Sequence, residues 1–89
     1  MSMKTRIEDK LARRFQPAFL EVIDESHLHA GHAGARPAGE THFRVRIEAP
    51  DFGGRTRLER HRLVNEALAE ELAERVHALA IDARPPAEP

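Results

Sequence analysis

Histidine is the residue type in this chain that is best suited to metal chemistry, and four of the six histidines fall in one short segment. The segment HLHAGHAGARPAGETHF spans residues 27–43 and carries His27, His29, His32 and His42 among glycines and alanines. His29 and His32 offer two imidazole nitrogens at close spacing, whereas a structural zinc site needs four ligands. The spacing alone leaves two interpretations open, a metal site and a solvated loop.

Arginine is the second residue type whose spacing could serve binding. Residues 55–62 carry Arg55, Arg57, Arg60 and Arg62 against a single glutamate. Residues 66–75 reverse the sign, with four glutamates against one arginine. A helix over both stretches would be basic at its start and acidic at its end, which is the reverse of what the helix macrodipole favours. The alternatives are a site for an anion or an acidic partner, helped by the free amides of a helix start, and a solvated basic face.

The composition limits the class of protein. A chain of 89 residues forms one small domain with one modest core, and four Phe with no Trp or Tyr make that core largely aliphatic. The net charge of -1 argues against binding to nucleic acid by bulk charge but allows a local basic patch. The chain has no cysteine, so it forms no disulfide and supplies no thiolate. No apolar run is long enough for a membrane span, and we expect a cytoplasmic protein that is not an enzyme, because no nucleophile–base pair is visible.

Local patterns predict the elements that position these residues, in the order helix, strand, strand, helix, strand. Ile7, Leu11 and Phe15 repeat at helical spacing over residues 5–15. Thr5 and Glu8 match a capping box at its start, and Pro17 ends it. Residues 19–24 read as a first strand.

A second strand is predicted over residues 41–49 by strict alternation. Phe43, Val45 and Ile47 share one face, and His42, Arg44, Arg46 and Glu48 share the other. The polar face predicts a sheet that helices cover on one side only. Pro50 ends the strand.

The remaining chain predicts a helix over residues 57–75 and a short strand over residues 76–83. Thr56 and Glu59 match a second capping box, and Val64, Leu68 and Leu72 form the apolar stripe. We expect one domain over residues 1–84, followed by a solvated tail over residues 85–89.

Four stretches of this sequence resemble the BolA family. They are LEVIDES, ETHFRVRI, FGGRTRLERHRLVNEALAEEL and VHALAI, and the resemblance runs in order from about Ile7 to Ala83. It implies an α/β domain of order αββαβ, with a three-stranded mixed sheet and helices on one face, like a type II KH module. KH modules clamp nucleic acid with a G-x-x-G loop, whereas Gly53 and Gly54 are adjacent here.

The resemblance implies a role as partner of a CGFS monothiol glutaredoxin in a heterodimer that shares a [2Fe–2S] cluster. Two histidines on one iron are an accepted form of cluster ligation. Because this chain lacks cysteine, it could supply only half of a site, and the glutaredoxin cysteine and glutathione would serve the other iron. Alone, the chain is expected to be a monomer without a cofactor.

The family pattern assigns the cluster ligands among the histidines. It implies His77, in VHAL, as the main ligand and His29 as the second, with His32 as the alternative loop ligand. His42 is expected near the site without being a ligand, His61 is expected to be structural, and His27 solvated.

The second function that the resemblance implies is DNA binding in transcriptional control of morphology, stress response and biofilm growth. The residues that would carry it, or contact the protein partner, are Arg55, Arg57, Arg60, Arg62, Arg44 and Arg46. The acidic stretch after residue 66 limits this footprint to a few phosphates, so binding is expected to be modest and strongly salt-dependent.

Overall fold

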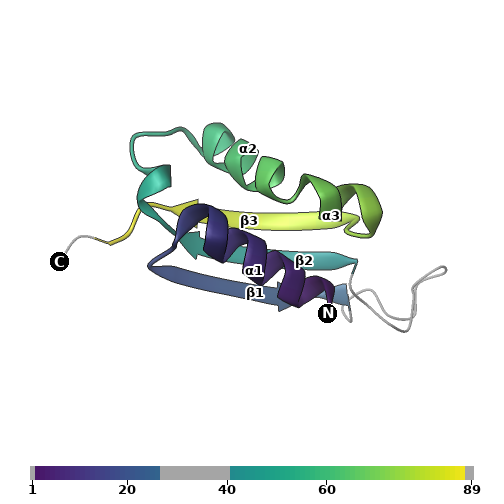
Figure 1. Cartoon of the computed structure of the whole chain (residues 1–89). Coiled ribbons are helices and arrows are strands. Elements are labelled where there is room, and N and C mark those ends of the chain that lie inside the picture. Colours follow the sequence, from purple (N-terminus) through teal and green to yellow (C-terminus); the bar gives the residue numbers. More distant parts are fainter. Residues whose placement is uncertain (1, 27–40, 88–89) are drawn as a thin grey trace.

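The computed structural model describes residues 2–26 and 41–87. In chain order these form α1 (Met3–Phe15), β1 (Phe19–Asp24), β2 (His42–Glu48), the 3₁₀ turn η2 (Pro50–Phe52), α2 (Arg57–Ala67), α3 (Ala69–Glu74) and β3 (Ala78–Arg84). The helices lie together over one face of the sheet (Figure 1). The two-layer α/β fold predicted from the sequence is confirmed, with the second predicted helix divided into α2 and α3.

The sheet is mixed and has the strand order β1-β2-β3. β1 runs antiparallel to β2, with Asp24 opposite Phe43, and β2 runs parallel to β3, with His42 opposite Ala78. The end of β1 and the starts of β2 and β3 therefore meet at the same end of the sheet.

The alternation of β2 sorts its side chains as predicted. Phe43, Val45 and Ile47 are buried against the helices, whereas Arg44 and Arg46 are exposed on the open face. The helices complete the core with apolar residues at helical spacing, namely Ile7, Leu11, Phe15, Val64 and Leu68. The η2 turn closes one end, where the ring centroids of Phe52 and Phe15 lie 5.0 Å apart.

The predicted start of the first helix was wrong. The helix begins at Met3, and the Ser2 hydroxyl oxygen accepts a hydrogen bond from the Thr5 amide at 3.1 Å, so Ser2 is the N-cap. Met3 is 5% exposed and extends the buried row of Ile7 and Leu11 by one turn. This added burial favours a helix start one turn earlier than the Thr5–Glu8 pattern indicates.

The prediction of one unbroken helix over residues 57–75 was also wrong. The chain leaves helical geometry at Leu68, whose φ is −107° and ψ is 18°. Leu68 is 1% exposed in the core and Glu71 is 0% exposed, so contacts with the rest of the fold set the path of this segment. Local helix propensity cannot predict such a break.

The break at Leu68 places the acidic residues at the start of a second helix and not at the end of one long helix. Glu70 and Glu71 lie in the first turn of α3, where the helix dipole favours negative charge. Glu71 Oε2 also lies 2.9 Å from both Arg6 Nη2 and Lys10 Nζ of α1. The acidic stretch is therefore an attachment between α3 and α1, and its charge order needs no functional explanation.

The predicted capping box at the start of α2 is present. The Thr56 amide donates to Glu59 Oε1 at 2.8 Å, and the Glu59 amide donates to the Thr56 hydroxyl at 3.2 Å. The hydrogen bond from the Thr56 amide lowers the pKa of Glu59. Its contribution to stability is therefore present above the unfolded-state pKa and is lost as the pH falls through the folded-state pKa.

Replacing Thr56 with alanine is expected to lower the free energy of unfolding by about 1 kcal/mol. The reason is that the Glu59 amide loses the hydroxyl oxygen that accepts its hydrogen bond. Urea unfolding at pH 7 measures this loss. The control is Thr5→Ala, which removes a hydroxyl that contacts the Ser2 hydroxyl at 2.8 Å but keeps the Thr5 amide that Ser2 caps. A Thr56→Ala protein as stable as the Thr5→Ala protein contradicts the prediction.

Candidate functional site

The ends of three strands meet beside His77, at one end of the sheet. Ser26 follows β1, Thr41 precedes β2, and His77 precedes β3. The Thr41 carbonyl accepts hydrogen bonds from the His77 amide at 2.7 Å and the Ala78 amide at 3.2 Å. These bonds fix the backbone of His77 while its side chain remains exposed.

His42 lies beside His77, the predicted main ligand. The two ring centroids are 6.4 Å apart and the rings are inclined by 54°. A 2.8 Å hydrogen bond joins His42 Nδ1 to the Thr41 hydroxyl oxygen. Two imidazoles thus stand next to each other at this end of the sheet.

The other predicted ligands fall in residues 27–40. His29 and the alternative His32 lie outside the described residues, as does His27. The two residues that bound this stretch are described, and the Ser26 hydroxyl oxygen accepts a hydrogen bond from the Thr41 amide at 2.9 Å. Both ends of the histidine-rich stretch are therefore attached next to His77.

The described residues do not by themselves form a complete metal site. Within residues 2–26 and 41–87, no group of three or more His, Asp or Glu side chains is placed to hold an ion. The pair of His42 and His77 amounts to a partial set of nitrogen donors. A metal centre here needs ligands from residues 27–40, from a second protein, or from both.

A basic groove runs along the outer side of β3, beside α2. It has a volume of about 460 Å³ and is lined by Arg44, Arg57, Arg60, His61, Ile81, Asp82, Ala83 and Arg84. We call it the β3 groove. It is made by side chains from β2, α2 and β3, so it exists only in the folded chain.

Arg60 of the β3 groove is held by two backbone carbonyls. Its guanidinium donates from Nε to the Arg55 carbonyl at 3.1 Å and from Nη1 to the Ala83 carbonyl at 3.2 Å. Among the described residues it forms no ion pair with a carboxylate. Its positive charge is therefore oriented but not neutralised.

The other predicted arginines do not all belong to this groove. Arg44 and Arg46 are paired across the open sheet face with Glu25 at 2.9 Å and Glu21 at 3.4 Å. Of these two, only Arg44 lines the groove.

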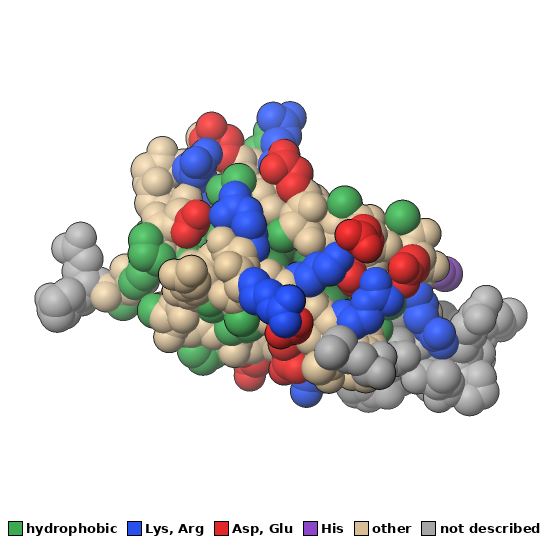
Figure 2. Space-filling view, viewed as in Figure 1, with side chains coloured by type: hydrophobic (Ala, Val, Ile, Leu, Met, Phe, Trp, Pro, Cys, Tyr) green, Lys and Arg blue, Asp and Glu red, His purple; other side chains and the backbone are tan. Residues whose placement is uncertain are grey.

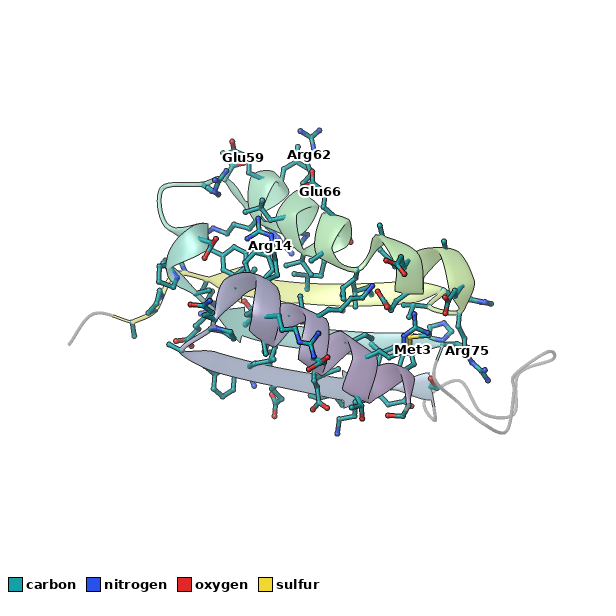
Figure 3. The ribbon with its side chains drawn as sticks, in the orientation of Figure 1. Met3, Arg14, Glu59, Arg62, Glu66 and Arg75 are labelled. Carbon is teal, nitrogen blue, oxygen red and sulfur yellow. The ribbon has the colours of Figure 1, made fainter. Side chains whose placement is uncertain are left out.

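Arg55 and Arg62 lie outside the groove. Arg55 donates from Nε to the Asp51 carbonyl at 2.9 Å. Arg62 points away from the sheet on the outer side of α2, near Glu59 (Figure 3). Basic and acidic side chains are interspersed over the face seen in Figure 2.

Sequence reasoning missed Arg84 and Asp82, which line the groove from β3. Arg84 Nε lies 2.8 Å from Asp82 Oδ1, and this hydrogen bond lowers the pKa of Asp82. The alternation of β3 puts the two residues on one face, but the predicted strand stopped at residue 83. His61, expected to be structural, also lines the groove.

No helix within the described ranges is both long enough and apolar enough to cross a bilayer.

Comparison with known proteins gives a consistent result over nearly the whole chain. The profile of the BolA-like protein family matches residues 11–88. The DNA-binding transcriptional regulator BolA of Escherichia coli is 48% identical over 81 residues, which cover 91% of this chain and 73% of that protein. A protein of a Sinorhizobium species, encoded in the cobS 5′ region, is 48% identical over 90 residues, which cover 100% of this chain and 97% of that protein.

A solved structure is similar to this chain in both fold and sequence. The BolA domain of SufE1 from Arabidopsis thaliana superimposes with a TM-score of 0.86 at 43% identity, and covers 97% of this chain and 94% of that domain. The structural similarity and the sequence similarity both extend over nearly the whole chain. The chain belongs to the BolA-like protein family.

Proposed function

We propose that this chain is an adaptor that pairs with a CGFS monothiol glutaredoxin and shares a [2Fe–2S] cluster with it through histidine ligands. The observation that carries the proposal is the meeting of the exposed His77 with both ends of the histidine-rich stretch, at Ser26 and Thr41. His77 is the proposed first ligand and His29 the second, with His32 as the alternative.

The donor set fits one half of such a cluster. Two imidazoles are known to ligate one iron of a [2Fe–2S] cluster. The thiolates that the other iron requires cannot come from a chain without cysteine. A partner with a reactive cysteine, together with glutathione, would supply them. When bound, the cluster would supply a one-electron redox centre.

Chain length favours His29 over His32 as the second ligand. His29 is three residues from Ser26, so the two Cα atoms can be at most about 11 Å apart, whereas His32 can lie up to about 20 Å from Ser26. A ligand on the shorter tether requires fewer residues to be ordered on binding, which lowers the entropic cost.

The test is anaerobic reconstitution of a CGFS glutaredoxin with iron, sulfide and glutathione, with and without this chain. We expect a visible circular dichroism spectrum that differs from that of the glutaredoxin alone, and a one-to-one complex in size-exclusion chromatography. An unchanged glutaredoxin spectrum at saturating concentrations of this chain contradicts the proposal.

DNA binding is the second candidate function, and the β3 groove favours it. Four arginines and one aspartate line the groove, and Arg60 is oriented without a carboxylate partner among the described residues. The Escherichia coli relative is named as a DNA-binding transcriptional regulator. The groove centres on Ile81–Arg84, roughly 13 to 23 Å along β3 from His77, so substitutions can separate the two functions.

Replacing Arg57 with alanine is expected to weaken binding to duplex DNA and to reduce the salt dependence. Arg57 is exposed, lines the groove and forms no ion pair among the described residues. Losing one phosphate contact lowers the slope of log K against log salt concentration by about 0.9. Fluorescence anisotropy across a salt series measures the slope.

Arg62→Ala is the matched control, because Arg62 is also an exposed arginine of α2 but points away from the sheet (Figure 3). We expect its salt slope to equal that of the unmodified chain. Equal losses in the two variants would mean that binding depends on overall charge and not on the groove.

A further inference from the structure

We infer that Ser26 and Thr41 are positioning residues that set the placement of His77 and His42. The inference rests on the proposed function for its purpose, but its physical basis is a hydrogen-bond network among described residues. That network joins the end of β1, the start of β2 and the residue before β3.

Ser26 is the centre of the network. It is only 9% exposed, and its hydroxyl oxygen accepts hydrogen bonds from the Thr41 amide at 2.9 Å and the His42 amide at 3.1 Å. The Ser26 amide in turn donates to Asp24 Oδ1 at 2.9 Å. A hydroxyl oxygen has two lone pairs, and the two backbone amides are its nearest donors, with the Thr41 hydroxyl at 3.5 Å.

Thr41 contacts both histidines, through different atoms. Its carbonyl accepts the amides of His77 and Ala78, so it fixes where β3 starts. Its hydroxyl oxygen lies 2.8 Å from His42 Nδ1, so it fixes the orientation of that ring. The backbone of one histidine and the side chain of the other thus depend on one residue.

The arrangement has a consequence for ligation. A metal ligand that is held before its partner binds loses less conformational entropy on binding. His77 has an exposed side chain, which by itself could adopt several rotamers, so control of its backbone and of the neighbouring His42 ring is the means by which the fold can restrict it. Ser26 touches neither imidazole in the described hydrogen bonds. It would act on His77 through Thr41, and on His42 through both Thr41 and the His42 amide.

Amide hydrogen exchange followed by NMR on the chain alone tests the inference without any cluster. In Ser26→Ala, the amides of Thr41 and His42 lose their acceptor, and we expect their exchange to accelerate about tenfold or more. The decisive observation is His77, whose amide is expected to accelerate as well and whose ring resonances are expected to shift. Val45, in the middle of β2, should keep its exchange rate.

Thr41→Val and Thr41→Ser separate the two paths from Thr41. Valine removes only the hydroxyl, so the His42 ring resonances are expected to shift while the His77 amide keeps its exchange rate. Serine keeps the hydroxyl and is expected to restore the His42 resonances. If Ser26→Ala fails to fold, the two Thr41 variants still test the role of Thr41.

The second readout is the position of the circular dichroism bands of the reconstituted complex, which reports ligand geometry and not the amount of complex. Shifted bands in Ser26→Ala at full cluster loading are expected. Unchanged exchange and ring resonances of His77 in Ser26→Ala, or unchanged His42 resonances in Thr41→Val, would overturn the inference. A failure of the proposed function would appear differently, as no new spectrum with the unmodified chain, and the exchange measurements would still decide the role of Ser26.

Discussion

Replacing His77 with alanine is expected to abolish the shared-cluster spectrum of the complex with a CGFS glutaredoxin. The imidazole is exposed and, among the described residues, makes no hydrogen bond that the fold needs. The backbone contacts of His77 run through its amide to the Thr41 carbonyl, and alanine keeps that amide. The substitution therefore removes a donor nitrogen and leaves the strand end in place.

Two measurements separate the loss of a ligand from the loss of structure. Urea unfolding of His77→Ala is expected to match the unmodified chain within about 0.5 kcal/mol, as for exposed substitutions generally. His61→Ala, which changes a histidine of the β3 groove, is expected to keep the cluster spectrum. If His77→Ala gives the same spectrum as the unmodified chain, His77 is not a ligand and the proposed site is wrong.

The same reconstitution assigns the second ligand. His29→Ala is expected to lose the spectrum and His32→Ala to keep it. The reverse result would transfer the role to His32 and leave the proposed function intact. Loss in neither variant would point to His42, whose ring lies beside His77.

Replacing Glu71 with alanine is expected to lower the free energy of unfolding by about 3 kcal/mol, more than any other substitution proposed for this chain. The side chain is 0% exposed and holds Arg6 and Lys10 of α1, each at 2.9 Å. Removing it leaves two cations facing a cavity, and breaking a buried pair by deleting one partner costs about 3–5 kcal/mol. The lower end applies because the Arg6 and Lys10 side chains are 28% and 33% exposed and can rehydrate.

Urea unfolding at pH 7 compares the free energies of unfolding of Glu71→Ala and of the control Glu70→Ala. Glu70 also faces Lys10, at 3.5 Å, but is 77% exposed, so its removal is expected to cost at most about 0.5 kcal/mol. Equal stability of the two variants would show that the attachment between α3 and α1 does not depend on the buried carboxylate. Glu71→Gln tests the charge at nearly constant volume and is expected to fall between them.

The carboxylate of Glu74, which Arg6 also binds, predicts how acid acts on this attachment. The hydrogen bond from Arg6 lowers the pKa of Glu74. A group whose pKa is lower in the folded state stabilises the fold above its unfolded-state pKa and loses that contribution as the pH falls through its folded-state pKa. The contact between α1 and α3 therefore weakens on the acid side.

The sequence by itself determined the parts of the fold that depend on local periodicity. The alternation of Phe43, Val45 and Ile47 defined β2 and its buried face, and the spacing of Ile7, Leu11 and Phe15 defined the buried face of α1. The capping box at Thr56 and Glu59 was also legible, because both partners lie within one helical turn. Such signals involve residues two to four positions apart and do not require knowledge of the fold.

The tertiary structure decided the features whose partners lie far apart in the chain. Ser26, Thr41 and His77 come together only because β1 and β2 are antiparallel and β2 and β3 are parallel. The charges divided in the same way: Arg57 and Arg60 line a groove with Arg84, and the buried Glu71 binds α1. Charge counts along the chain could not show which carboxylate or carbonyl each cation meets, because long-range contacts are set by the packing of the whole core.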